Sequence, residues 1–254
     1  MDFIQFSYKN DSELTLLSIQ SIFKNVKNIG KVIIFNDLNN PIDVNIVELL
    51  KKQYYPKIIV VDTNWNRNGN LIGQHHFFNY INILNILKRK NIITSNSVVK
   101  LDPDTIILKD NLLEEFNKSQ NMVGGDFMYS EWYPIGPCYY FKSELIEKLL
   151  WSINHYHVSS EKEDVEFGRR AIYLSNKFDL RIPTSEISID DIKFVDSRQN
   201  LTGGILFSSY KTTVDIIKDN NIEIFSAGLD FEVEKDKEIK NKQLSCLKEI
   251  LTSI

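Results

Sequence analysis

The chain has 254 residues, of which 43% are hydrophobic, and its 30 lysines and arginines stand against 34 aspartates and glutamates, for a formal net charge of −4 at pH 7. A hydrophobic fraction of this size can build a sizeable core, so an intrinsically disordered chain is not expected. Proteins that bind nucleic acid through its phosphates need a basic surplus or a basic stripe, and the sequence contains neither a positive balance nor a run of five basic residues. We therefore expect a globular protein with no nucleic acid among its partners.

The two cysteines, Cys138 and Cys246, lie far apart in the chain and form neither a disulfide framework nor a Cys-x-x-Cys metal motif. The first ten residues lack a basic stretch followed by an apolar one, and no segment reaches the roughly 18 apolar residues of a membrane span. These features predict a cytoplasmic protein without a signal peptide or a transmembrane segment.

The first 110 residues alternate short runs rich in β-branched residues with helical patterns. The expected strands are 3–6, 32–35, 58–62 and 98–101, and the expected helices between them are 12–23, 44–53 and 72–90. Strands joined by helical crossovers predict a largely parallel sheet. Ligands bind beyond the carboxyl ends of the strands in such sheets, so the residues that follow each strand matter most.

The second half of the chain has a less regular, α+β order. Its expected strands are 122–127, 137–141, 205–207 and 222–225, and its expected helices are 143–151 and 164–176. The final stretch, 232–254, is a charged helix with one apolar face, expected to pack on the body of the protein or on a second copy in a homo-oligomer. The sequence shows no internal repeat and no Pro/Gly/Ser-rich linker, so we expect a single domain over 1–254. Within it we distinguish three parts, 1–110, 111–230 and 231–254.

Two carboxylates, Asp102 and Asp104, follow the fourth expected strand, and apolar runs flank them on both sides. Side chains at positions i and i+2 of an extended chain share one face, and Pro103 biases Asp102 toward that conformation. The pair can therefore converge on a hard divalent cation such as Mn²⁺ or Mg²⁺, which prefers oxygen ligands and completes its shell with water and phosphates. Two alternatives stay open: Asp-Pro-Asp is also a favourable turn sequence, and Lys100 shares the strand face with Asp102 and can form a salt bridge without any metal.

The order apolar strand, Asp-x-Asp, apolar strand resembles the metal site of nucleotide-sugar-dependent glycosyltransferases with the GT-A fold, of a family-2-like or related bacterial or viral branch. Three more segments, FIQFSYKNDSELTLLSIQSI, KVIIFNDLNN and NRNGNLIGQHHFFNYINILNIL, resemble the first strand, loop and helix of that fold, its second strand, and its Gln-bearing helix. The likeness covers about residues 1 to 175. It implies that the following residues contact the nucleotide, with the two cationic ones near the phosphates: Ser7, Tyr8, Lys9, Asp37, Arg67, Gln74 and Asp102.

The resemblance implies an α/β, GT-A-like fold, in which a Rossmann-type, mostly parallel sheet is flanked by helices. Residues 1–110 would form the nucleotide-binding half and residues 111–230 an α+β acceptor half. The implied activity is that of a metal-dependent hexosyltransferase, which moves a hexose-type sugar from a nucleotide-sugar donor, with UDP expected, to a hydroxyl acceptor such as a glycan. The implied cofactor is Mn²⁺ or Mg²⁺, held by Asp102 and Asp104.

The segment SSEKEDVEFGRRAIYL resembles the helix that opens with an acidic pair in this fold, which places Glu163 and Asp164 at its start. An inverting transferase needs a carboxylate there as a general base for the acceptor hydroxyl. Glu163 also fits a capping box with the serine three residues before it, so we assign it mainly to capping and prefer Asp164 as the base. Glu166, with Arg169 or Arg170, is expected to form a surface ion pair.

An aromatic, Gly- and Pro-rich segment lies between the metal strand and this helix. Trp132 and Tyr133 are acceptor candidates because flat apolar faces with polar tips suit sugar rings, with core packing as the alternative. Cys138 is expected to be buried and unreactive. The chain lacks the late histidine that many metal-dependent members use, so the third ligand is left open among the diphosphate and three late carboxylates. These are Asp190, Asp191 and Asp196.

Three other functions remain as alternatives. A sugar nucleotidyltransferase uses a similar sheet, but the loop SYKNDSEL lacks the glycines that its phosphate loop would need. A non-catalytic nucleotide- or sugar-binding module would bind nucleotide without turnover, and a purely structural protein would not bind it at all. The sequence does not distinguish retention from inversion, because that depends on how acceptor and base are placed.

Overall fold

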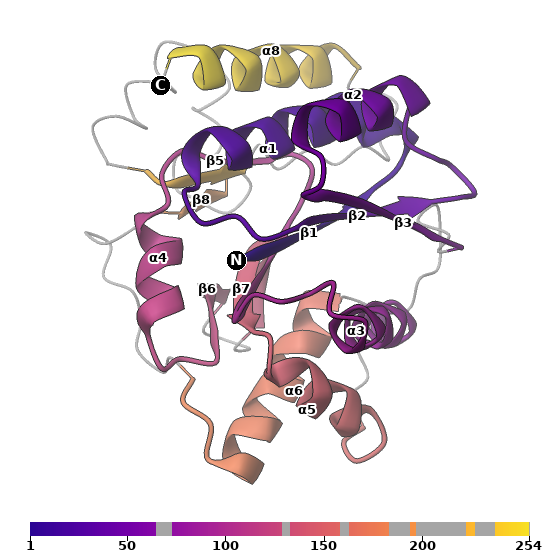
Figure 1. The fold of residues 1–254 in the computed structure, drawn as a ribbon. Coiled ribbons are helices and arrows are strands. Elements are labelled where there is room, and N and C mark those ends of the chain that lie inside the picture. Colours follow the sequence, from indigo (N-terminus) through magenta and orange to yellow (C-terminus); the bar gives the residue numbers. More distant parts are fainter. Residues whose placement is uncertain are drawn as a thin grey trace.

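A six-stranded sheet with the strand order β3-β2-β1-β4-β7-β6 lies at the centre of the protein, with helices on both faces (Figure 1). The structure is a computed structural model. It describes residues 1–64, 73–128, 133–157, 163–182, 194–196, 222–226 and 237–253.

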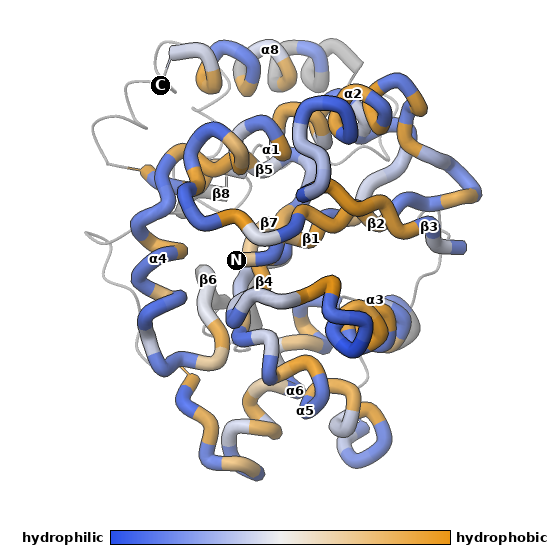
Figure 2. Tube along the Cα trace, in the orientation of Figure 1, coloured by the Kyte–Doolittle hydropathy of each residue, from blue (hydrophilic) through white to orange (hydrophobic). Residues whose placement is uncertain are grey.

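Four neighbouring strands pair in parallel: β1 (Asp2–Ser7), β2 (Val32–Asp37), β3 (Ile58–Thr63) and β4 (Ser97–Leu101). Strand β7 (Tyr133–Lys142) pairs antiparallel both with β4 and with β6 (Val123–Met128). The inner strands are nearly continuous apolar runs because helices cover both of their faces (Figure 2). This confirms the expected α/β sheet, and each strand of the parallel part extends its predicted range by one or two residues.

Helices connect the parallel strands and form two layers. On one face lie α1 (Ser12–Asn25), α2 (Val44–Tyr54) and the C-terminal α8 (Lys237–Ser253), and on the other lie α3 (Gly73–Arg89), α5 (Leu145–Ile153) and α6 (Glu163–Phe178) (Figure 1). A short 3₁₀ helix, η1 (Lys9–Asp11), links β1 to α1. Helix α2 begins where the Asp43 carboxylate accepts a hydrogen bond from the backbone N–H of Asn45, 2.7 Å away, a typical N-cap.

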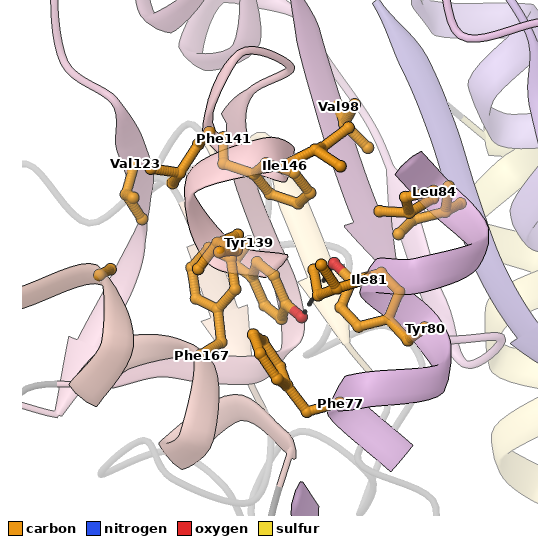
Figure 3. Packing of buried hydrophobic residues seen from close by; sticks show 14 of the residues in the cluster. Phe77, Tyr80, Ile81, Leu84, Val98, Val123, Tyr139, Phe141, Ile146 and Phe167 are labelled. Atoms are coloured by element: carbon orange, nitrogen blue, oxygen red, sulfur yellow. Dashed lines mark hydrogen bonds between the residues drawn. The ribbon is translucent and has the colours of Figure 1, made fainter. Parts of the chain in front are cut away.

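Each face of the sheet has its own apolar core, because successive residues of a strand point to opposite faces. In β4, Val99 and Leu101 pack with α1 and α2, whereas Val98 packs with α3, α5 and α6. Figure 3 shows the second of these cores, in which Tyr139 of β7 lies between aromatic side chains of α3 and α6. Lys100 shares this face, since its Nζ atom lies 5.6 Å from the centre of the Tyr139 ring.

The structure contains a smaller sheet and a helix that the sequence analysis predicted only in part. The sheet has the order β5-β9-β8 and consists of β5 (Thr105–Ile107), β9 (Ile224–Ser226) and β8 (Phe194–Asp196). Strand β8, which contains Asp196, and helix α4 (Asn111–Lys118) were not predicted, because three and eight residues are too short for a clear periodicity. The expected strand at 205–207, and the candidates Asp190 and Asp191, lie outside the described residues.

The C-terminal helix packs on the body of the protein, which was one of the two arrangements expected from the sequence. Lys248 forms a 3.0 Å ion pair with Glu13 of α1, and Lys24 donates a hydrogen bond of 2.5 Å to the carbonyl of Leu251. Leu247 is fully buried. Among the helices that the structure describes, none is both long enough and apolar enough to cross a membrane.

Candidate functional site

The two aspartates of the Asp-x-Asp pair follow β4, a central strand, at the edge where the parallel strands end. The backbone N–H of Thr105 donates to the carbonyl of Asp102 over 3.1 Å, which closes a tight turn between β4 and β5. The Asp102 side chain is 24% exposed, whereas Asp104 is buried. The segment therefore is a turn, which was one of the alternatives for it, and the turn lies at the carboxyl edge of the parallel strands, where ligands bind in sheets of this kind.

Helix α1 and strand β1 hold this turn in place through buried hydrogen bonds. The side-chain amide of Gln5 donates to the Ser18 hydroxyl over 2.8 Å and to the carbonyl of Asp102 over 3.2 Å. The Ser18 hydroxyl in turn donates to the carbonyl of Thr105 over 2.6 Å. Because these groups are buried and paired, the backbone of the turn is fixed from both sides.

Lys100 forms a salt bridge with Asp102, as the alternative interpretation of the sequence proposed. Its Nζ atom lies 2.6 Å from Oδ1 of Asp102, and the lysine side chain is only 4% exposed. Burial by itself lowers the pKa of Lys100, but the carboxylates of Asp102, Glu163 and Asp164 act against it and raise the pKa above its usual value. Lys100 is therefore a buried, protonated cation at the Asp-x-Asp turn.

The acidic pair at the start of α6 is linked to Lys100 through Tyr139, because the Tyr139 ring lies 5.6 Å from Nζ of Lys100 and its hydroxyl bonds Glu163. The Tyr139 hydroxyl donates a hydrogen bond to Oε1 of Glu163. Burial raises the pKa of Glu163 to about 7, although Lys100 and this hydrogen bond oppose the shift. Oδ1 of Asp164 accepts a hydrogen bond from the next backbone N–H, over 2.9 Å. The serine of the expected capping box lies outside the described residues, so that box stays a prediction.

The nucleotide-binding candidates on β1 and β2 are near the same edge and are mostly buried. The Ser7 hydroxyl accepts a hydrogen bond from a threonine of α1 over 2.9 Å, and Tyr8 is 6% exposed. Asp37 is buried and accepts a hydrogen bond from the backbone N–H two residues further on, over 2.9 Å. Lys9 is exposed. Each of these residues follows or ends a parallel strand, as predicted.

The side chains of four other candidates are not among the described parts of the chain. Gln74 lies in α3 and Tyr133 in β7, but only their backbones are among the described parts of the chain. Arg67 and Trp132 lie outside the described residues. Their predicted contacts with nucleotide and acceptor stay predictions.

The ion pair predicted for Glu166 is present but is not on the surface, so that prediction was wrong in its placement. Arg170 Nη2 lies 2.5 Å from Oε1 of Glu166, and both side chains are fully buried. Arg170 also donates to the carbonyls of Ser152 and Tyr156, over 2.7 and 2.9 Å. The pair is buried because it joins α6 to the end of α5, a contact that spacing within one helix does not reveal.

Cys138 and Tyr139 follow one another in β7 and point to opposite faces. Cys138 is 2% exposed, which confirms that it is buried. Burial raises the pKa of its thiol to about 12, in keeping with the expected low reactivity. Tyr139 was not singled out in the sequence. Its role depends on the antiparallel register that places it opposite Lys100, and no local pattern reports that register.

The donor chemistry of the turn fits a hard divalent cation, because carboxylate oxygens are the ligands that Mn²⁺ and Mg²⁺ prefer. Within the described ranges, no group of three or more His, Cys, Asp and Glu side chains is placed to hold a metal ion. One oxygen of Asp102 is also engaged by Lys100. A cation at Asp102 and Asp104 would therefore share its coordination with a diphosphate and water.

Comparison with solved structures identifies the fold. No protein-family model and no curated protein sequence matches the chain. The structure of the galactosyltransferase LgtC in complex with donor and acceptor sugar analogues matches with a TM-score of 0.53 and 11% identity, over 100% of this chain and 96% of that one. The apo structure of the bifunctional glycosyltransferase WbbM matches with a TM-score of 0.55 and 10% identity, over 99% of this chain and 51% of that one. The protein thus has the GT-A-like fold that the sequence resemblance implied.

Proposed function

We propose that the protein is a metal-dependent glycosyltransferase, which transfers a hexose-type sugar from a nucleoside diphosphate sugar, with UDP as the expected nucleotide, to a hydroxyl of a glycan or another acceptor. One observation supports the proposal: in a GT-A-like fold, Lys100 pairs with Asp102 of the Asp-x-Asp turn and lies 5.6 Å from the ring of Tyr139, whose hydroxyl donates to Glu163 at the start of α6. The two distant cysteines support a cytoplasmic location.

The residues of the turn would bind and orient the donor. A divalent cation held by Asp102 and Asp104 would neutralise the diphosphate as it leaves the sugar. Lys100 offsets part of the negative charge of the turn, which would otherwise repel a diphosphate. Gln5 and Ser18 hold the turn rigid, so little reorganisation is needed when the donor binds.

The carboxylates of α6 would act on the acceptor. In an inverting reaction, a general base must take the proton of the acceptor hydroxyl as the glycosidic bond forms. Asp164 and Glu163 are the candidates. The pKa of Glu163, at about 7, is suited to a base at neutral pH because the group is partly ionised and still basic.

The experiment that tests the proposal is calorimetric titration of UDP and GDP into the protein, with Mn²⁺ and then with EDTA. We expect one nucleotide to bind only with the metal and to lose that binding in Asp104→Asn, which keeps the shape of the side chain and removes its charge. Asp179→Asn is the matched control, because Asp179 is exposed at the end of α6 and its φ of 52° is one that asparagine tolerates. If neither nucleotide binds with Mn²⁺, the proposal fails.

A second measurement separates an enzyme from a binding module. Release of nucleoside diphosphate from a panel of nucleotide sugars, with and without acceptor glycans, reports turnover. Metal-dependent nucleotide binding without hydrolysis or transfer would favour the non-catalytic module. The internal salt bridge between Lys100 and Asp102 fits this alternative, since it partly neutralises the turn without a ligand.

A further inference from the structure

Lys100 lies in the middle of the central sheet with its charged end at the candidate site. Its backbone is paired with Ile4 of β1 on one side and with Tyr139 of β7 on the other. The side chain is 4% exposed, and its Nζ atom lies 2.6 Å from Oδ1 of Asp102. Because strands on both sides hold Lys100, the position of its positive charge relative to the turn is set by the sheet.

The charge of Lys100 opposes a cation that arrives alone. Such a cation meets a like charge next to one of its two protein ligands, and one oxygen of that ligand is already engaged. A nucleoside diphosphate changes this balance, because it brings negative charge and further oxygen ligands to the same place. Binding of cation and nucleotide should therefore be coupled, and by linkage each must strengthen the other by the same factor.

We propose that Lys100 is a positioning residue that sets the order in which the site fills: it orients Asp102 through their ion pair and keeps a divalent cation weakly bound until a nucleoside diphosphate is present. This inference rests on the proposed function. It assigns Lys100 a role beyond that of a structural salt bridge, which would leave binding of the metal alone unaffected.

Lys100→Met removes one partner of a buried ion pair, so it is expected to lower the stability of the protein. Methionine has a similar length and can keep the contact with the Tyr139 ring, which lies 5.6 Å from Nζ of Lys100. Asp102 is 24% exposed, so water can solvate its carboxylate when its partner is lost, which limits the cost.

The test measures Mn²⁺ binding by electron paramagnetic resonance, with and without UDP or, where UDP does not bind, GDP. In the unaltered protein we expect the nucleotide to tighten Mn²⁺ binding by about tenfold or more. In Lys100→Met, we expect Mn²⁺ alone to bind about fivefold tighter than in the unaltered protein, with a smaller enhancement by nucleotide. Lys100→Arg keeps the charge and should keep the coupling.

Lys142→Met is the matched control. Lys142 lies at the far end of the same strand pair, opposite Ser97, and donates to the carbonyls of Phe116 and Asn117 over 3.0 and 2.9 Å. The Lys142→Met variant should bind Mn²⁺ with the same affinity as the unaltered protein.

Two results would overturn this inference without overturning the proposed function. One is nucleotide binding to the unaltered protein with the same Mn²⁺ affinity in its presence and absence, a measurement that needs no variant to fold. The other is a Lys100→Met protein that is folded by circular dichroism and binds Mn²⁺ with unchanged affinity. If neither nucleotide binds in the presence of Mn²⁺, the proposed function fails as well, so the two failures are distinguishable.

Discussion

The hydroxyl of Tyr139 donates a hydrogen bond to Oε1 of Glu163 and so joins the central sheet to the first residue of α6. The same hydroxyl lies 3.4 Å from that of Tyr80 in α3 (Figure 3). Burial raises the pKa of Tyr80, Tyr139 and Glu163, and the negative charge of Glu163 adds to the shift of both tyrosines. Three elements from different parts of the chain thus meet at one carboxylate beside Lys100.

Of the two candidate bases, Glu163 is the one with a raised pKa, and it is expected to set the acidic limb of the pH dependence of activity. Its pKa is raised to about 7, and a general base works only when ionised. We therefore expect kcat/KM to rise with pH to a plateau, with an apparent pKa near 7. Glu163→Gln should lower kcat by about 10²- to 10⁴-fold, the usual contribution of a general base. A highly active Glu163→Gln variant with the same acidic limb would assign the limb to another group.

The same group should make the folded protein less stable as the pH rises. The folded-state pKa of Glu163 lies above its ordinary value, so the folded state binds more protons than the unfolded state between about pH 4.5 and 7. The free energy of unfolding should fall through this window, by less than about 1.4 kcal/mol per pH unit for one group. Urea denaturation at several pH values should show a shallower fall in Glu163→Gln. An identical pH dependence in both proteins would contradict the raised pKa.

Tyr139→Phe should shift the acidic limb to higher pH. The hydrogen bond from Tyr139 favours the ionised form of Glu163, and its loss leaves the effect of burial less opposed. The phenyl ring keeps the packing against Phe167, whose ring centre lies 4.6 Å away. Tyr140→Phe is the control, because Tyr140 points to the opposite core. The comparison is made on pH profiles of kcat/KM, and an unshifted limb in Tyr139→Phe would show that the hydrogen bond does not act on the base.

Arg170→Met should destabilise the protein strongly. It leaves the fully buried Glu166 without its partner, and it removes the hydrogen bonds that tie α6 to the end of α5. Loss of one partner of a buried ion pair costs about 3–5 kcal/mol. Lys51→Met, which breaks an exposed pair with Glu48, should change the free energy of unfolding by less than about 1 kcal/mol. Similar effects of the two substitutions in urea denaturation would argue against a structural role for the buried pair.

Ser21→Ala should loosen the strand that follows the Asp-x-Asp turn. The Ser21 hydroxyl accepts a hydrogen bond of 2.9 Å from the buried backbone N–H of Ile107 in β5. An unpaired buried N–H costs about 1–3 kcal/mol. Ser175→Ala, which removes a hydroxyl that bonds only within its own helix at Ile172, should cost less. Hydrogen exchange at Ile107 reports the local effect, and unchanged protection in Ser21→Ala would contradict it.

Much of the architecture could be predicted from local patterns. The runs at β1, β2, β3 and β4 are apolar and β-branched, and the helices between them have a clear helical periodicity, so their type and order follow from neighbouring residues alone. The place of Asp102 and Asp104 at the strand end follows from the same pattern. Short elements such as β8 and α4 were not predicted from the sequence because they have too few residues to show a periodicity.

The composition of the site was less predictable. Lys100 and Asp102 lie two residues apart, so their pairing could be anticipated as one of several alternatives. The contact of Tyr139 with Glu163, and the burial of Glu166 with Arg170, could not. Both depend on where α6 packs against the sheet and against α5.

The sequence by itself therefore determined the strand and helix order of the first 110 residues and the position of the Asp-x-Asp pair, because hydrophobic periodicity is a property of adjacent residues. Only the tertiary structure decided that Lys100 lies against the ring of Tyr139 and that the Tyr139 hydroxyl donates to Glu163. These contacts require the antiparallel register of β7 on β4 and the docking of α6, which arise from packing between segments far apart in the chain.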